Sequence, residues 1–354
     1  MPILLIVFFL YASTVLANER LGLPAIAVPQ DKALIQLGKD VFNDTHFSTN
    51  NTISCTSCHA PEKAFTDQRA TAKGIYGQIG NRNAPTLLNV AFFKQFFHDG
   101  RANSLEQQAL GPLLNPVEHG LESPEYIEQI IQQNPDYVQR FSQVFNIDKD
   151  DIRAEHLAKV IAAYERTLIA GNSAFDQYYF GRDRSKLSKS AARGLLIFRR
   201  KGNCANCHEI SMNDALFTDN RFYNLGQGFE KMEAILPNFI AAIKQGQNPD
   251  DFPLTAEQRA ELGRFNVTHA LQDIGKFKTP TLRNIALTAP YMHDGSIKTL
   301  EEVVDYYDKG GHKNPYLDSA IYPLHLNEQE KADLVAFMRA LTSEQESAAE
   351  PVQE

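Results

Sequence analysis

The chain has 354 residues, 43% of them hydrophobic, which is ordinary for a globular protein and leaves room for two modest domains. This composition excludes disorder as the default state. The formal net charge of −8 gives no reason to propose nucleic acid as a partner, because phosphate-binding surfaces are basic. An acidic surface is compatible with a basic electron-donor protein, although a mild acidic excess usually only keeps a protein soluble.

The amino-terminal segment has the pattern of an export signal. Residues 2–15 are apolar and uncharged, and the small residues before Asn18 have the spacing that a signal peptidase cleaves. We expect residues 1–17 to be a cleaved signal peptide and the mature protein to be periplasmic. An uncleaved anchor is the alternative, because the segment lacks the usual Lys or Arg. No other segment approaches the roughly 20 apolar residues that span a bilayer.

The rest of the chain is expected to be mainly α-helical, because apolar residues recur at helical spacing and strand signals are scarce. The helical segments are 31–43, 104–114, 124–145, 151–169, 188–200, 299–308 and 327–341. Several begin with residues that favour a helix N-cap, namely Ser104, Ser123, Asp150, Ser188, Thr299 and Asn327.

All four cysteines fall into one pattern, C-x-x-C-H. It occurs as C-T-S-C-H at Cys55, Cys58 and His59, and as C-A-N-C-H at Cys204, Cys207 and His208. In this pattern the thiols bind the vinyl groups of a haem covalently and the histidine is the proximal iron ligand. Two haem c groups are therefore predicted. A thioredoxin-like dithiol does not require the trailing histidine twice, and a zinc site would require both pairs to converge.

Three sequence blocks recur at a constant offset of 195 residues, as from Pro85 to Pro280. The blocks A-P-T-L-L-N-V-A, F-H-D-G and S-L-E-Q recur as T-P-T-L-R-N-I-A, M-H-D-G and T-L-E-E. The C-x-x-C-H motifs are only 149 apart, so the second copy contains 46 extra residues. We infer two cytochrome c-like haem domains related by an internal repeat. Their predicted limits are 18–170 and 188–342, with an inter-domain crossing at 171–187 and a polar tail at 343–354.

The sixth iron position decides what each haem can do, since an iron with two strong protein ligands relays electrons and one with an open face can bind peroxide. By the offset of 195, Tyr307 corresponds to Pro112, which has no side-chain donor. We predict that Tyr307 closes the second haem and that the first is open; Met292 is the alternative ligand. Near Pro112, Glu118 is the candidate general acid/base and Gln108 a positioning hydrogen-bond donor.

Longer motifs match a known family. They are R-N-A-P-T at Arg82, F-F-x-D-G-R at Phe96, E-Q-Q-A-L-G-P-L at Glu106, N-P-V-E at Asn115, F-K-T-P-T-L-R-N at Phe277, A-P-Y-M-H-D-G at Ala289 and L-E-E-V-V at Leu300. From about residue 32 to 341 the chain resembles bacterial dihaem cytochrome c peroxidases and the related MauG enzymes. The resemblance implies a peroxidatic haem held by His59 and an electron-transfer haem held by His208. It also assigns the family's catalytic glutamate to Glu118 and its glutamine to Gln108.

The same resemblance implies a calcium ion between the domains. Its expected ligands are the Asn83 side chain and the backbone carbonyls of Thr288 and Pro290, in line with the preference of calcium for oxygen. Relatives also suggest a homodimer.

Three departures from the family pattern matter. Tyr307 stands where typical peroxidases have methionine, as in MauG-like members. No histidine lies near Ile75 or Tyr76, where peroxidases have a removable distal ligand, so the first haem should need no reductive activation. His98 replaces the tryptophan between the haems, and the chain has no tryptophan. We interpret His98 either as a polar bridge that bonds a haem propionate or as a packing substitution.

Of the other histidines, His293 is expected to be buried and structural. The remaining ones have no ligand pattern and are expected on the surface or in loops: His46, His119, His156, His269, His312 and His325.

The sequence thus predicts a periplasmic dihaem peroxidase that reduces hydrogen peroxide with electrons from a c-type cytochrome or cupredoxin. One alternative is a MauG-like enzyme that uses peroxide to oxidise residues of a partner protein. A second alternative is a non-enzymatic dihaem electron carrier, which would require both irons to be six-coordinate.

Overall fold

The computed structural model describes residues 20–343. This part of the chain is rich in helices and has a single two-stranded sheet, which confirms the mainly α class. The predicted signal peptide 1–17 lies outside the described residues, as does the tail from 344 onward. Within residues 20–343, the search for a helix long and apolar enough to cross a bilayer finds none.

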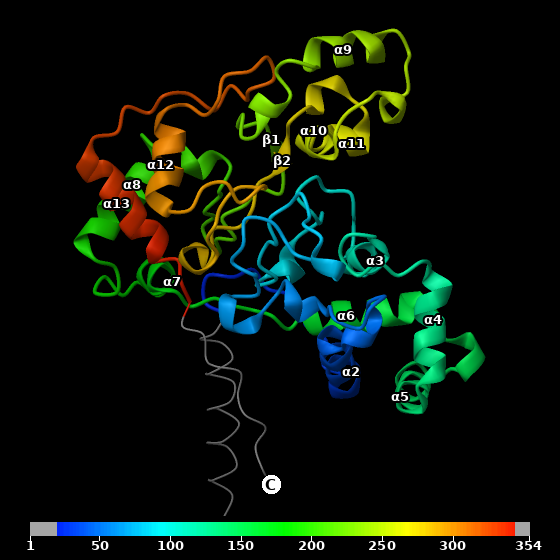
Figure 1. Cartoon of the computed structure of the whole chain (residues 1–354). Helices are drawn as coiled ribbons and strands as arrows, with labels where there is room; N and C mark the ends of the chain where they lie inside the picture. The colour runs from blue at the N-terminus through cyan, green and yellow to red at the C-terminus, as the bar shows by residue number, and fades with distance from the viewer. Residues whose placement is uncertain (1–19, 344–354) are drawn as a thin grey trace, which may run out of the picture.

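The first group of helices surrounds the amino-terminal hydrophobic core (Figure 1). Its members are α2 (Lys32–Asn43), α3 (Leu105–Leu114), α4 (Pro124–Gln133), α5 (Pro135–Phe145) and α6 (Ala154–Glu165). Helices α2 and α6 cross closely at Gly38, where a Cβ atom would lie 1.9 Å from the Val160 carbonyl oxygen. Only glycine permits this approach.

The second group encloses a separate core on the other side of the molecule (Figure 1). It consists of α7 (Ala174–Tyr179), α8 (Lys189–Arg199), α12 (Leu300–Asp308) and α13 (Glu328–Arg339). Helices α8 and α13 cross at Gly194, where a Cβ atom would lie 2.0 Å from the Asp333 carbonyl oxygen. The main crossing of each core is therefore made possible by a glycine.

A third, smaller core lies in the 46 extra residues of the second half. Its helices are α9 (Leu236–Lys244), α10 (Ala256–Glu261) and α11 (Phe265–Thr268), seen at the top of Figure 1. We call this inserted segment the lobe. Strands β1 (Phe222–Tyr223) and β2 (Phe277–Lys278) pair antiparallel where the lobe leaves and rejoins the second half. The Arg264 guanidinium donates to the backbone carbonyls of Asp99 and Gly100, so the lobe also contacts the first half.

Short 3-10 turns connect these elements, and two of them contain the first cysteine of each C-x-x-C-H motif. The turns are Thr45–Phe47, Cys55–Ser57, Pro61–Lys63, Ile75–Gly77, Val90–Phe92, Lys149–Asp151, Cys204–Asn206, Phe229–Lys231, Pro249–Asp251, Leu271–Asp273 and Ile285–Leu287.

Two of the helix predictions were wrong in detail. Segment 124–145 is two helices, because Pro135 lacks the N–H needed for continuation and the Asn134 side chain caps α5. Asp150 is not an N-cap, because residues 149–151 form their own 3-10 turn and α6 begins after Arg153. The segment 171–187, expected as a crossing, contains α7, whose Phe175 is fully buried in the second core.

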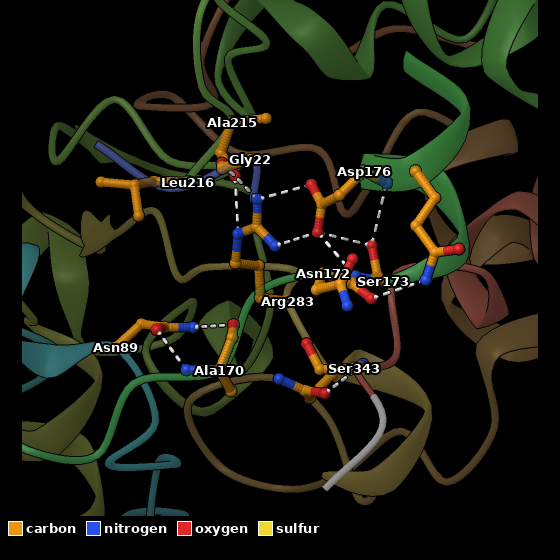
Figure 2. A network of polar contacts seen from close by, with 12 residues as sticks. Gly22, Asn89, Ala170, Asn172, Ser173, Asp176, Ala215, Leu216, Arg283 and Ser343 are labelled. Carbon is orange, nitrogen blue, oxygen red and sulfur yellow. Dashed lines mark hydrogen bonds and ion pairs between the residues drawn. The ribbon is translucent and has the colours of Figure 1, made fainter. Parts of the chain in front are cut away.

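A buried polar network joins the two halves beside this crossing (Figure 2). The Arg283 and Asp176 side chains form an ion pair at 2.8 Å with both side chains fully buried. Arg283 also donates to the backbone carbonyls of Gly22 and Ala215, and Ser173 donates to Asp176. The ion pair and its hydrogen bonds thereby connect four segments that are distant in sequence. Each of the two buried charges is compensated by the other.

Matching backbone contacts recur in both halves. Asn89 and Asn284 both have positive φ, 65° and 59°. The Asn89 N–H donates to the Leu168 carbonyl, and the Asn284 N–H donates to the Leu341 carbonyl. Two residues further along in each case, the backbone N–H of Ala170 or Ser343 donates to the asparagine side chain. Both asparagines therefore connect the end of a terminal helix to the loop that follows a haem motif.

Candidate haem sites

Both C-x-x-C-H motifs open onto one cavity of about 590 Å³. Every residue to which the sequence assigned a role, apart from Cys55, lines this cavity. The lining includes Cys58, His59, Asn83, His98, Gln108, Glu118, Cys204, Cys207, His208, Thr288, Pro290 and Tyr307. Cys55 packs instead against the amino-terminal core.

The two motif histidines are oriented in the same way. The Nδ1 atom of His59 is 3.0 Å from the Phe65 carbonyl oxygen, and Nδ1 of His208 is 2.8 Å from the Phe217 carbonyl oxygen. A histidine whose Nδ1–H donates to a carbonyl presents Nε2 as the metal ligand. Burial lowers the pKa of both rings, which favours the neutral form that ligates iron.

The four cysteines are partly buried thiols and form no disulfide in the described chain. Burial raises the pKa of Cys58 and Cys204 to about 12 and that of Cys207 to about 11. Reactive dithiols have a lowered pKa, so these thiols do not suit thioredoxin-like exchange. The two pairs, each beside an oriented histidine, fit covalent haem attachment.

Glu118 lies in the turn after α3, and its surroundings suit acid–base chemistry in the first half. Its Oε1 accepts a hydrogen bond of 2.7 Å from the Asn115 amide, which holds the carboxyl in one orientation. Burial raises the pKa of Glu118, and the positive charge of Arg101 and the Asn115 bond partly oppose the rise. A carboxyl with a raised pKa and one free oxygen can accept a proton and return it.

Gln108 and Pro112 lie one helical turn apart on α3, and both line the cavity. Among the described residues, none forms a hydrogen bond with the Gln108 side-chain amide, although the neighbouring Gln107 side chain accepts from Asn103. Gln108 can therefore donate to a small molecule in the cavity. Pro112 offers only carbon atoms there.

Tyr307 occupies the corresponding position on α12 in the second half. Its phenol lines the cavity, and burial raises its pKa. No hydrogen-bond acceptor for this hydroxyl is found between residues 20 and 343, whereas the hydroxyl of the adjacent Tyr306 donates to the Leu225 carbonyl. A phenol oxygen without a partner in this part of the chain, in the cavity that His208 also lines, fits an iron ligand.

His98 lies at the boundary between the halves. Its Nε2 is 3.0 Å from the Asn83 carbonyl oxygen, and its own carbonyl accepts from the Lys278 backbone N–H at 2.7 Å. Burial lowers the pKa of His98 to about 3, so the ring is neutral near pH 7. Because Nε2–H donates to Asn83, Nδ1 is left as an acceptor.

The three predicted calcium ligands, Asn83, Thr288 and Pro290, line the same cavity. The Asn83 amide nitrogen donates to the Arg69 carbonyl at 2.8 Å, which leaves its Oδ1 atom for a cation. These oxygen donors suit calcium.

A different cluster, Glu261, His293 and Asp294, brings potential metal-ligand atoms within 4.8 Å of one another. Lys231 already lies 3.0 Å from the Glu261 carboxylate and compensates its charge.

Sequence reasoning missed two buried charged groups and misjudged one histidine. Lys278, which corresponds to Asn83 by the offset of 195, is a cavity-lining lysine whose pKa burial lowers to about 8. Its place directly before a repeated block was the available signal. Glu165 is buried at the end of α6, and its burial could not be read from local sequence. His119 was expected on the surface or in a loop; it lies in the turn after α3, but its side chain is buried and bonds the Phe47 carbonyl. His293 is buried as expected.

Comparison with known proteins gives consistent matches. The family model for di-haem cytochrome c peroxidase matches residues 32–184. Cytochrome-c peroxidase IdrP1 of Pseudomonas sp. (strain SCT) is 34% identical, covering 90% of this chain and 84% of that protein. Methylamine utilization protein MauG of Methylorubrum extorquens is 33% identical, covering 90% and 82%. The crystal structure of a MauG-like protein associated with microbial copper homeostasis has a TM-score of 0.73 and 31% identity, covering 91% and 94%.

These relatives match over most of their own length as well as over most of this chain, so the likeness includes both C-x-x-C-H motifs. The family carries two haem c groups, and the cavity and its oriented histidines fit them. The chain belongs to the di-haem cytochrome c peroxidase and MauG family.

Proposed function

We propose that the protein reduces hydrogen peroxide to water at the first haem site, with electrons that a small redox protein delivers at the second. The observation that carries this proposal is the asymmetry of the cavity. In the first half, Pro112 lines the cavity together with the Glu118 carboxyl, which Asn115 orients, and with the Gln108 amide. In the second half, the Tyr307 phenol takes the place that corresponds to Pro112, and it has no hydrogen-bond partner within the described chain.

When bound, haem iron supplies the redox chemistry, and an iron with an open face can bind peroxide. Glu118 takes the proton from the inner oxygen of peroxide and returns it to the outer oxygen, which leaves as water. Its raised pKa suits both transfers, and Asn115 keeps the carboxyl in place. Gln108 donates a hydrogen bond that positions the peroxide.

The second half serves electron transfer. His208 and Tyr307 would be the two protein ligands of the iron there, and an iron with two strong protein ligands relays electrons. His98 lies between the halves as a neutral hydrogen-bonding bridge. We further propose export to the periplasm, one calcium ion held by Asn83, Thr288 and Pro290, and a homodimer.

The second candidate is a MauG-like enzyme that directs the oxidising power to residues of a partner protein. Tyr307 favours it, and relatives named MauG are as similar to the chain as relatives named peroxidase. A pure electron carrier is the third candidate. It would need a sixth protein ligand at the first iron, and Pro112 offers none.

The test uses the protein with both haems attached. Peroxide is added with a reduced small c-type cytochrome, and a peroxidase should oxidise two cytochromes for each peroxide. A MauG-like enzyme would leave the cytochrome reduced and modify a partner protein instead. The resting ferric protein should give one high-spin and one low-spin electron paramagnetic resonance signal. Two low-spin signals without turnover would support the carrier and exclude both enzymes.

A further inference from the structure

We propose that Tyr223, paired with Asp219, is the residue through which single electrons pass from the protein surface to the second haem. The inference rests on the proposed function, because peroxide reduction supplies the oxidising equivalents. It adds a redox-active residue and a site for one-electron donors at the edge of β1.

The composition narrows the choice of residue. The chain has 13 tyrosines and no tryptophan, so a phenol is the most easily oxidised aromatic side chain available. Oxidation of a phenol near pH 7 requires that its proton leave with the electron, since the unperturbed pKa of tyrosine is about 10. A redox-active tyrosine therefore needs a nearby proton acceptor as well as contact with a haem.

Four tyrosines line the cavity, and only one of them meets both conditions. They are Tyr223, Tyr291, Tyr307 and Tyr322. Tyr291 donates to the Ile285 carbonyl, which cannot take a proton, and Tyr307 is the proposed iron ligand. Tyr322 is 46% exposed and has no hydrogen-bond partner within the described chain. Tyr223 donates to the Asp219 carboxylate at 2.6 Å.

The position of Tyr223 connects the haem attachment to solvent. Its side chain lines the same cavity as Cys207, the second attachment cysteine of the carboxy-terminal motif. The side chain is partly exposed at the end of the short strand β1, and Asp219 is also partly exposed. The backbone N–H of Arg221 donates to the other oxygen of Asp219 at 2.9 Å, which fixes the carboxylate. One partly exposed residue thus also lines the cavity that would hold the haem.

The electron and proton steps balance. One electron moves from the Tyr223 phenol to the oxidised second haem, and the phenolic O–H proton moves to Asp219, which leaves a neutral tyrosyl radical. A one-electron donor at the surface, such as a reduced c-type cytochrome, then reduces the radical. The proton returns from Asp219 to the phenol, and two such cycles account for one peroxide.

The experiment compares Tyr223→Phe with Tyr322→Phe, both in protein that carries two haems as checked by its visible spectrum. After one equivalent of peroxide without donor, wild type and Tyr322→Phe should show a tyrosyl radical in the electron paramagnetic resonance spectrum, and Tyr223→Phe should lose that signal. With reduced cytochrome, Tyr223→Phe should turn over at least tenfold more slowly, while its initial reaction with peroxide keeps the wild-type rate. Asp219→Asn, which keeps the phenol, should slow cytochrome turnover in the same way.

Two results would overturn the role of Tyr223: an unchanged radical in Tyr223→Phe, or equal cytochrome turnover in Tyr223→Phe and Tyr322→Phe. If wild type does not react with peroxide, the proposed function fails instead. Tyr223 is then tested by photochemical oxidation of the protein with a ruthenium tris-bipyridine oxidant. A tyrosyl radical that Tyr223→Phe abolishes supports the role, and its absence from wild type rejects it.

Discussion

The two candidate haem sites share several backbone contacts and differ in the side chains that line the cavity. In both, a carbonyl bonds Nδ1 of the motif histidine and an asparagine with positive φ joins the loop to a terminal helix. They differ in the side chains that the repeat predicts at the sixth coordination position. The first half presents Pro112 with Glu118 nearby, and the second presents Tyr307.

The difference shows how a repeated domain acquires two tasks. Groups that attach and orient a haem are needed twice, so their contacts occur in both halves. The groups proposed to act on peroxide or to close the iron are needed once, and they occupy positions at which the two halves differ. The unequal positions are therefore where substitutions should separate the two activities.

Glu118→Gln should have the largest effect. It removes the proton acceptor but keeps the shape, and loss of a general acid/base typically lowers the rate by about 10²–10⁴-fold. Peroxide turnover of wild type should fall at acid pH as Glu118 becomes protonated, at a pH above that of an ordinary carboxyl because its pKa is raised. The measurement is kcat/KM for peroxide between pH 4 and 8.

Glu106→Gln is the matched control, because Glu106 pairs with Arg166 outside the cavity. It should keep the rate of wild type within a few fold. A loss below tenfold in Glu118→Gln would show that another group moves the proton.

Tyr307→Phe should abolish the low-spin ferric signal of the second haem and leave the first unchanged. Phenylalanine fills the same space but has no oxygen to offer the iron. Electron paramagnetic resonance of the resting protein measures the change. Tyr306→Phe is the control, since its hydroxyl bonds the Leu225 carbonyl. An unaltered low-spin signal in Tyr307→Phe would exclude Tyr307 as the iron ligand and favour Met292, the alternative ligand.

Arg283→Met should destabilise the protein by about 3–5 kcal/mol, because it leaves the buried Asp176 carboxylate without its partner. Leu88, which corresponds to Arg283 in the first half, has no such partner, so Leu88→Met should change stability by less than about 1.5 kcal/mol. Denaturant unfolding of the haem-loaded protein measures both. The double variant Arg283→Met, Asp176→Leu should recover most of the loss; failure to recover would mean that the bonds to Gly22 and Ala215 dominate.

Local patterns predicted the helices and the haem motifs because helical spacing and C-x-x-C-H are short-range signals. The repeat also indicated that Tyr307 and Pro112 would take corresponding places in the two halves, and both line the cavity. Contacts between distant segments were not predictable in this way. Arg283 meets a residue 107 positions away, and no property of either residue alone identifies the other. Burial of a polar side chain likewise depends on the packing of several helices.

Glu165 is such a case, and it gives the smallest predicted effect. Asn89 contacts Leu168 and Asn284 contacts Leu341, so these two leucines correspond. Three residues before them, Glu165 in the first half therefore corresponds to Met338 in the second. Its side chain is buried, and its Oε2 atom has no hydrogen-bond partner among residues 20–343. Burial raises the pKa of this carboxyl from 4.5 to about 8.

The folded protein therefore binds a proton that the unfolded chain releases. The stability that this carboxyl contributes is complete below pH 4.5 and is lost as the pH rises through 8. Glu165→Gln removes the titration, so it should be more stable than wild type at pH 9, by on the order of 3 kcal/mol, and no more stable at pH 4. Thermal unfolding at both pH values measures the difference, with the exposed Glu328→Gln as control. A gain that is equal at both pH values would mean that the glutamine forms a new bond, since only loss of an ionisation makes the effect depend on pH.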